Sequence, residues 1–354
     1  MKRILLFLSI ALSFQVSAAF CGNPSGKTIS FLTFNIWQEG TSVPNGFEKI
    51  KDVITTVNPD VVCFVEVRNY HHKDWTSRMV QALTKAGKHY YAGYAGGDVA
   101  FISKYPIDKG RLIFSNADRG TIVLFNLHVD GKTLVLAGAH LDYTHYACYL
   151  PRGYNGGDPN WKMINNGHGK PAPVTDTAYL TAYDLKSTRD EAVSAFLKAV
   201  KTTTDPVILM GDFNEPSCLD WTKKTQNRFD HHGVVILWPV TLKLSKAGFV
   251  DVFRTFYPDE VKSPGFTWPS YADDKGSTSW APLADERDRV DYIFFRGKNI
   301  KIENVALVGN RKYYVYNQPD TANTGNETFL AEHLPWPSDH KAVFATLIFH
   351  FSNK

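Results

Sequence analysis

The chain has 354 residues, of which 44% are hydrophobic and 21% charged, and its formal net charge is +4. This composition is typical of a globular protein with enough apolar side chains to bury a sizeable core. The small basic excess is compatible with an anionic substrate. It does not by itself indicate nucleic-acid binding, and the sequence has no polybasic cluster.

The N-terminus has the three parts of a secretory signal peptide. Lys2 and Arg3 precede an apolar stretch at residues 4–14, and small residues at 16–18 form a cleavage zone. The apolar stretch is shorter than the roughly 20 residues that span a bilayer, and no later segment is suited to crossing one. We therefore expect residues 1–19 to be removed and the mature chain to be secreted or periplasmic. An uncleaved membrane anchor is the alternative.

Four cysteines, Cys21, Cys63, Cys148 and Cys218, would remain after this cleavage. In an exported chain they permit three disulfide pairings, among which the sequence does not choose. Cys63 lies inside an apolar stretch of strand length, so we expect it to be a buried free thiol.

Short apolar stretches rich in β-branched and aromatic residues predict strands along the whole chain. In chain order they are Ile29–Ile36, Val61–Val67, Val99–Ser103, Thr121–Val129, Thr133–Ala139, Pro206–Met210, Val290–Phe295, Ile300–Val308 and Ala342–Phe349. Asp130-Gly131 separates the fourth stretch from the fifth, and this dipeptide between two apolar stretches predicts a hairpin.

Helical spacing of apolar residues occurs between some of these strands. It predicts helices at residues 47–57, ending before Asn58-Pro59, at 75–87 and at 192–199. Such an order favours an α/β fold with one mixed sheet, or with two sheets packed face to face and helices outside. No linker-like tract divides the chain, so residues 20–354 are expected to form a single domain.

Residues 143–177, here called the tyrosine-rich segment, are also rich in Gly, Pro and Asn. The segment is too long for an ordinary connection, and segments of this size are usually functional or disordered. Its tyrosines favour an ordered role facing a substrate.

Polar side chains recur where the predicted strands begin or end. They are Asn35, Glu66, His140, Asp142, Asp212, Asn214, Asp291, Asp339 and His340. Taken singly, an acidic residue at a strand end is more often a cap or a turn former. Asp291 differs because it lies inside an apolar strand, where a buried carboxylate needs a partner. Oxygen ligands, an activated water and a proton donor are the requirements of metal-assisted phosphoester hydrolysis.

The motifs around these residues resemble the endonuclease/exonuclease/phosphatase superfamily, which includes deoxyribonuclease I. The matching stretches are FNIW with Asn35, FVEVRN with Glu66, SKYPI at 103–107, GAHLD with His140, GDFNEPS with Asp212 and Asn214, GFTWPS with Trp268, DRVDYIF with Asp291 and WPSDHKAV with Ser338, Asp339 and His340. The match extends from about residue 29 to 349. The resemblance implies a four-layer α/β sandwich, with two packed mixed β-sheets flanked by helices and an active site at one edge of the sheets.

The resemblance also implies roles. Glu66 would be the main carboxylate ligand of Mg²⁺ or Mn²⁺, with Asn35 and Asp339 close by. Asp212 and Asn214 would orient the attacking water and a phosphate oxygen. His340, held by Asp291, would be the acid–base partner or phosphate clamp, and His140 would donate to the phosphate. Further substrate contacts are expected from Arg119, Tyr143 and Trp268. An exposed loop arginine is an equal alternative for Arg119.

The sequence leaves the substrate open. A secreted phosphodiesterase is expected, with a nuclease acting on DNA or RNA, a sphingomyelinase or an inositol-phosphate phosphatase as alternatives. Trp161, Trp268 and Trp280 could stack on a sugar, base or inositol ring or lie at a lipid surface, and the modest charge favours a dedicated duplex nuclease least. A non-enzymatic binding module of the same fold is the further alternative. Nothing indicates an obligate protein partner, and we expect a monomer.

Overall fold

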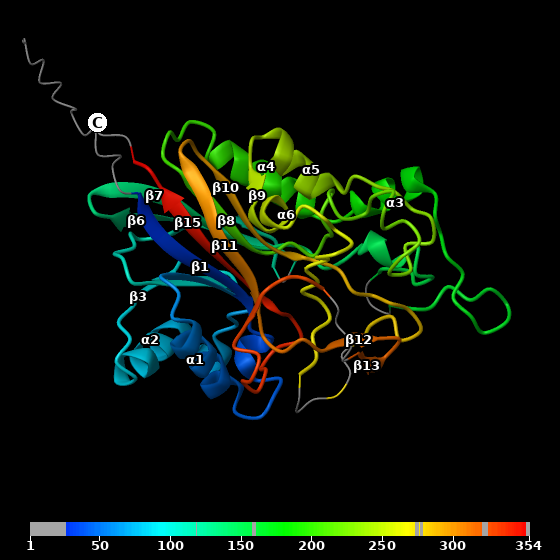
Figure 1. Cartoon of the computed structure of the whole chain (residues 1–354), viewed down its shortest axis with the longest axis horizontal. Helices are drawn as coiled ribbons and strands as arrows, with labels where there is room; N and C mark the ends of the chain where they lie inside the picture. Colours follow the sequence, from blue (N-terminus) through cyan, green and yellow to red (C-terminus); the bar gives the residue numbers. More distant parts are fainter. Residues whose placement is uncertain are drawn as a thin grey trace, which may run out of the picture.

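The computed structural model describes residues 26–117, 119–157, 161–272, 276, 279–320 and 325–351. Within these ranges most strands belong to two large sheets (Figure 1). The expected signal peptide and Cys21 lie outside the described residues.

The first sheet has seven strands in the order β14-β11-β15-β1-β2-β4-β3. In chain order these are β1 (Lys27–Asn35), β2 (Val61–Val65), β3 (Tyr91–Tyr94), β4 (Val99–Ser103), β11 (Ile300–Val308), β14 (Phe329–Leu330) and β15 (Ala342–Phe349). The second sheet has six strands in the order β5-β6-β7-β8-β10-β9. They are β5 (Arg111–Ser115), β6 (Thr121–Val129), β7 (Lys132–His140), β8 (Val207–Asp212), β9 (Val250–Asp251) and β10 (Asp291–Arg296). A separate ribbon pairs β12 (Tyr313–Val315) with β13 (Gln318–Asp320).

Helices α1 (Gly46–Val57) and α2 (Trp75–Lys85) cover the outer face of the first sheet, and α4 (Arg189–Ala199) and α5 (Pro239–Lys246) cover that of the second. The shorter α6 (Val252–Phe256) packs into the core between the sheets, and α3 (Thr177–Asp184) packs against the tyrosine-rich segment. Short 3₁₀ turns are η1 (Gln38–Gly40), η2 (Tyr70–His72) and η3 (Ala147–Tyr149). In Figure 1, α1 and α2 lie on one side of the molecule and α4 and α5 on the opposite side, with the sheets between them.

Strand alternation divides the apolar residues between the layers. In β1, Phe31 belongs to the core between the two sheets, whereas Leu32 packs toward the layer of α1 and α2. Because successive side chains of a strand point to opposite faces, one strand supplies two cores. A third core joins the outer face of the second sheet to Phe196 of α4 and Leu244 of α5. The expected four-layer sandwich is therefore confirmed.

The predicted hairpin is also present, between β6 and β7. Val129 pairs with Lys132, and the two residues between them, Asp130 and Gly131, have φ angles of 49° and 76°. Two consecutive positive φ values are those of the type I′ turn, whose twist matches that of the flanking strands.

The strand pairing brings distant polar residues together at one end of the sheets. Asp212 at the end of β8 lies in register with His140 at the end of β7 and with Asp291 at the start of β10. In the first sheet, Asn35 at the end of β1 pairs with Val65, the residue before Glu66. The ends of strands from both sheets thus define one site.

The tyrosine-rich segment is folded onto the body of the protein. Tyr146, Tyr149 and Tyr154 are buried in a fourth apolar cluster together with Trp221 and Trp268. The segment is therefore ordered where it is described. Most of its tyrosines are structural, and two of them reach the site described below.

Cys63, Cys148 and Cys218 are buried free thiols. This confirms the expectation for Cys63 and leaves no disulfide among the described cysteines. Among the helices in the described ranges, none has the length and apolar character needed to span a membrane.

Candidate active site

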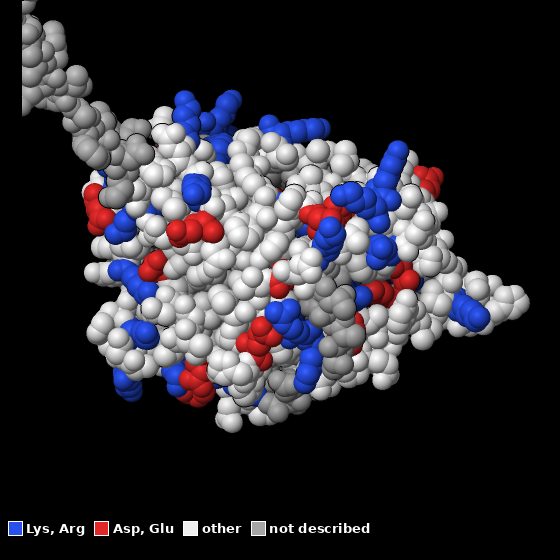
Figure 2. All heavy atoms as spheres, viewed as in Figure 1, with Lys and Arg blue, Asp and Glu red and all other residues white. Residues whose placement is uncertain are grey.

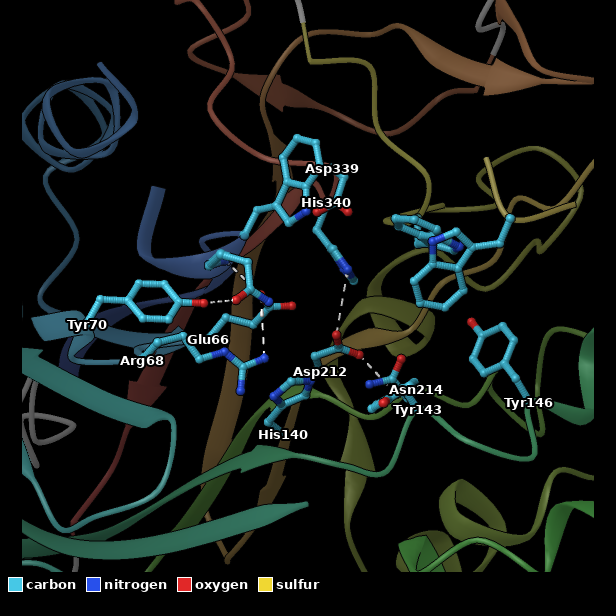
Figure 3. A pocket seen from close by; sticks show the side chains of 14 residues that line it. Glu66, Arg68, Tyr70, His140, Tyr143, Tyr146, Asp212, Asn214, Asp339 and His340 are labelled. Atoms are coloured by element: carbon cyan, nitrogen blue, oxygen red, sulfur yellow. Dashed lines mark hydrogen bonds and ion pairs between the residues drawn. The ribbon is translucent and has the colours of Figure 1, made fainter. Parts of the chain in front are cut away.

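A cavity of about 590 Å³ lies where the strand ends of both sheets meet. It is lined by Trp37, Gln38, Glu66, Arg68, Tyr70, His140, Tyr143, Tyr146, Asp212, Asn214, Trp268, Trp280, Asp339 and His340. Figure 3 shows Glu66, His140, Asp212 and His340 directed toward this common space. Most of the residues predicted from the sequence are thus brought together.

Glu66 is held in place from two sides. Asn35 Nδ2 donates to Glu66 Oε1 at 3.2 Å and to Asp212 Oδ2 at 3.0 Å, while the Gln38 amide N–H and Nε2 donate to Glu66 Oε2 at 2.7 and 2.9 Å. The backbone of Glu66 has a φ of 68°, a left-handed conformation that is costly for a residue other than glycine. Such strain is typical of a side chain whose direction matters.

Asn35 is fully buried and has no contact with the cavity itself. Its Oδ1 accepts the Trp37 N–H at 3.0 Å, so both ends of the amide are engaged by the protein. The structure therefore places Asn35 as the group that positions Glu66 and Asp212.

Asp339 is buried beside Glu66 and lacks the partners that a buried carboxylate needs. Within the described chain, its Oδ1 has no hydrogen-bond partner. Burial and the charge of Glu66 raise the pKa of Asp339 to about 8. Two carboxylates with an unpaired buried oxygen form a place that a hard divalent cation fits, since Mg²⁺ and Mn²⁺ prefer oxygen ligands.

His340 forms a dyad with Asp291. Its Nδ1 lies 2.9 Å from Asp291 Oδ2, and its Nε2 lies 3.7 Å from Asp212 Oδ2. Although burial opposes the charged ring, the carboxylates of Asp291 and Asp212 raise the pKa of His340 to about 10. Thr267 Oγ1 accepts the N–H groups of Val290 and Asp291 and so fixes the start of β10.

Ligand atoms of Asp212, Asp291 and His340 lie within 4.8 Å of one another, which is also close enough to hold a metal. The hydrogen bond between His340 Nδ1 and Asp291 uses one ring nitrogen, and the raised pKa of His340 keeps a proton on Nε2 as well, so the charged ring of the dyad has no lone pair for a metal.

The Ser338-Asp339-His340 run is tied to the opposite end of the chain. Ser338 Oγ donates to the Asn35 carbonyl at 2.7 Å and accepts the His340 N–H at 3.0 Å. The same fully buried hydroxyl therefore connects β1 to the loop that carries Asp339 and His340.

Asn214 follows Asp212 in a tight turn with a φ of 47°. Its N–H donates to Asp212 Oδ1 at 2.9 Å, and its Nδ2 donates to the Leu141 carbonyl at 3.0 Å. Burial and the charge of Asp291 raise the pKa of Asp212 above its usual range. A carboxylate of raised pKa facing a cavity is suited to accept a proton from water.

His140 has a partner that the sequence reading missed. Its Nδ1 lies 2.6 Å from Asp98 Oδ2, which also accepts from Arg68 at 2.9 Å. Burial opposes the charge on both groups, yet their attraction lowers the pKa of Asp98 to about 2 and raises that of His140 to about 9. The one sequence signal was the position of Asp98, directly before the apolar strand that begins at Val99.

We expect Asp98→Asn to move the alkaline limb of the pH–rate profile to lower pH. In the native protein His140 keeps its proton up to a pH of about 9. Without the carboxylate, burial is opposed only by the charges of Asp212 and Glu66, so the pKa of His140 should fall well below about 9. An NMR titration of His140 and the pH dependence of kcat/KM measure the shift. Asp108→Asn, which breaks the exposed His128–Asp108 pair, is the matched control.

Arg119 is exposed and does not belong to the lining of the cavity. Tyr143 and Trp268 do line it, as expected. Trp37, Gln38, Arg68 and Tyr70 also line the cavity although they were not singled out in the sequence. Gln38 and Arg68 contact Glu66 directly, and Tyr70 contacts Gln38; these tertiary contacts follow from no local pattern.

The site is that of a phosphoesterase: carboxylates suited to a divalent cation lie beside a His–Asp pair and a second charged histidine. The chain belongs to the Endonuclease/Exonuclease/phosphatase family, whose sequence profile matches residues 32–340. Uncharacterized protein F14F9.5 of Caenorhabditis elegans is 27% identical over 348 residues, which cover 98% of this chain and 99% of that protein.

Solved structures with similar folds were also found. Danio rerio TDP2 in complex with a single-strand DNA product is 16% identical, with a TM-score of 0.49, covering 90% of this chain and 98% of that one. The human nocturnin catalytic domain with bound sulfate is 13% identical, with a TM-score of 0.48, covering 90% and 94%. The family assignment confirms the predicted enzyme class, a metal-dependent phosphoester hydrolase.

Proposed function

We propose that this protein is a secreted phosphodiesterase that uses Mg²⁺ or Mn²⁺ together with a His–Asp dyad. The observation that carries the proposal is that a carboxylate site suited to a cation and a protonated histidine lie in the same cavity. The Asp339 carboxylate, with its unpaired buried oxygen, lies near Glu66, and the protonated His340 of the dyad lies beside Asp212. Secretion rests on the signal-peptide pattern of residues 1–19.

Glu66 and Asp339 would hold the cation. When bound there, it would supply charge neutralisation and polarisation of a phosphate oxygen. Asn35 and Gln38 keep the Glu66 carboxylate in position through the hydrogen bonds described above.

The proton chemistry comes from the strand ends of the second sheet together with His340, which lies in the loop before β15 of the first sheet. Asp212 accepts a proton from the attacking water, and Asn214 fixes the orientation of Asp212. His140 donates from its charged ring to a phosphate oxygen as negative charge builds up. His340 holds a proton at Nε2, with Nδ1 fixed by Asp291, and releases it to the leaving-group oxygen.

The cavity lining, in which Arg68 is the one Lys or Arg among the described residues, supports a compact substrate. On the face shown in Figure 2, Lys and Arg side chains are interspersed with Asp and Glu and form no continuous basic stripe. A protein that tracks a nucleic-acid duplex needs rows of cations to neutralise phosphates. The simplest assignment is a monomer that acts on one small phosphoester at a time. Because the predicted catalytic residues lie together in the cavity, we favour an enzyme over a non-enzymatic binding module.

The test measures how fast the metal-stripped protein hydrolyses bis-p-nitrophenyl phosphate, a diester, and p-nitrophenyl phosphate, a monoester. Each rate is measured with and without added Mg²⁺ or Mn²⁺. The proposal predicts cation-dependent hydrolysis of the diester at a rate well above that of the monoester. Plasmid DNA, sphingomyelin and inositol phosphates complete the panel. Turnover of monoesters alone would overturn the diester assignment, and turnover without a cation would overturn the metal dependence.

A further inference from the structure

One side of the cavity consists of aromatic side chains. Tyr143, Tyr146, Trp268 and Trp280, here called the aromatic wall, line the same space as the carboxylates and histidines. Figure 3 shows Tyr146 across the cavity from Glu66, on the far side of Asp212 and Asn214. Trp37 and Tyr70 also line the cavity, and Figure 3 shows Tyr70 beside Glu66, whereas the aromatic wall adds a surface that takes no part in the proposed chemistry.

Trp280 is held in place by a buried anchor. Its backbone N–H and that of Ala281 donate to Glu286 at 3.0 and 3.1 Å, and Tyr149 donates to the same carboxylate at 2.6 Å. Trp161 stacks on the Trp280 ring with centroids 4.4 Å apart and an interplanar angle of 26°. Trp280 nevertheless remains partly exposed and faces the cavity. A partly exposed indole fixed in this way is pre-organised to receive a ligand.

Trp268 connects the aromatic wall to the catalytic groups. Its Nε1 donates to the Tyr149 hydroxyl at 3.1 Å, and its ring lies 5.3 Å from that of His340. Trp268 and Trp280 are themselves in contact, with centroids 5.0 Å apart. A group attached to a phosphate beside His340 would therefore meet the Trp268–Trp280 pair next.

The cavity has little charge left for a second phosphate. Among the described residues that line it, Arg68 is the one Lys or Arg, and it is already paired with Asp98 at 2.9 Å and lies 3.7 Å from Glu66. A volume of about 590 Å³ is nevertheless ample for a substrate of drug-like size. The space beyond one phosphate is thus suited to an uncharged group.

We propose that this site selects phosphoesters that carry a single phosphate and a neutral planar ring, which stacks on the partly exposed Trp280 beside the buried Trp268. The inference rests on the proposed function and names its substrate class. Aromatic side chains bind flat π-systems with little dependence on ring identity, so a nucleobase and an aryl group share the required chemistry. The tyrosine-rich segment, through Tyr149 and Trp161, acts as the support of the aromatic wall.

Binding of small phosphate monoesters tests this without relying on turnover. Titrations in the presence of Mg²⁺, followed by calorimetry and by quenching of tryptophan fluorescence, would compare phenyl phosphate, thymidine 5′-monophosphate, methyl phosphate and myo-inositol 1-phosphate. We expect the two planar-ring ligands to bind about tenfold more tightly than methyl phosphate. If thymidine 5′-monophosphate has the lower Kd, the substrate carries a nucleobase. If phenyl phosphate has the lower Kd, the substrate is an aryl ester.

Variants locate the effect. Trp280→Ala should remove most of the planar-ring preference and leave the Kd of methyl phosphate unchanged, while Trp280→Phe should keep much of it. Tyr179→Ala, which removes an exposed tyrosine outside the cavity, is the matched control. The inference would be overturned if methyl phosphate or myo-inositol 1-phosphate bound as tightly as phenyl phosphate. It would also be overturned if Trp280→Ala kept the native preference for planar-ring ligands. Failure of all four ligands to bind would instead contradict the proposed function, on which the inference depends.

Discussion

Replacing His340 by alanine is expected to lower kcat for a diester about 10³-fold, because a positioned acid–base group typically contributes 10²- to 10⁴-fold. His340 lies beside Asp212, and its raised pKa leaves a proton at Nε2 available at neutral pH. The KM should change far less, since His140 is proposed to contact the phosphate as well. Steady-state kinetics with bis-p-nitrophenyl phosphate measure both constants.

His333→Ala is the matched control for this change, since it removes an exposed histidine from the same segment of chain. Asp291→Asn keeps the shape of the dyad and removes its charge, so it should lower kcat less and move the alkaline limb of the pH–rate profile downward. A His340→Ala enzyme that keeps native kcat would contradict the role of the dyad.

Glu66→Gln should abolish cation-dependent turnover, with a loss of at least about 10²-fold at saturating Mg²⁺. The side-chain amide of the variant has the shape of the carboxylate but not its charge. Asn35 Nδ2 and Gln38 Nε2 donate to the two oxygens of Glu66, so the new NH₂ group would face another donor at one of these positions. Initial rates measured over a range of Mg²⁺ concentrations separate weaker metal binding from slower chemistry.

Glu48→Gln removes the charge of an exposed glutamate on α1 and should leave these rates unchanged. If Glu66→Gln kept the native rate and the native Mg²⁺ dependence, the metal would have to lie elsewhere in the cavity.

Much of the fold was predictable because its strands are strongly apolar. Each apolar stretch became a strand within a few residues of its predicted ends, and the Asp130-Gly131 dipeptide fixed the hairpin between β6 and β7. The short helices α3, α5 and α6 and the short strands β3, β5, β9, β12, β13 and β14 were not predicted. Elements of this length carry too few residues for a periodic pattern, and tertiary contacts define them.

The site was predictable where a polar residue follows an apolar strand, as with Glu66, His140 and Asp212. Asp98 was missed because its importance depends on a contact with His140 across 42 positions of sequence. Asn35 was expected near the metal, and the structure gives it a supporting position, with both ends of its amide used within the protein. Pairings of this kind arise from sheet register, which no local pattern encodes.

The most direct test of the central claim is the location of a bound cation. Crystals soaked in Mn²⁺ and measured at the manganese absorption edge would show it as a peak of anomalous scattering. The account predicts a peak in contact with the carboxylates of Glu66 and Asp339. A peak held instead by Asp212, Asp291 and His340, or no peak in the cavity at saturating Mn²⁺, would contradict it.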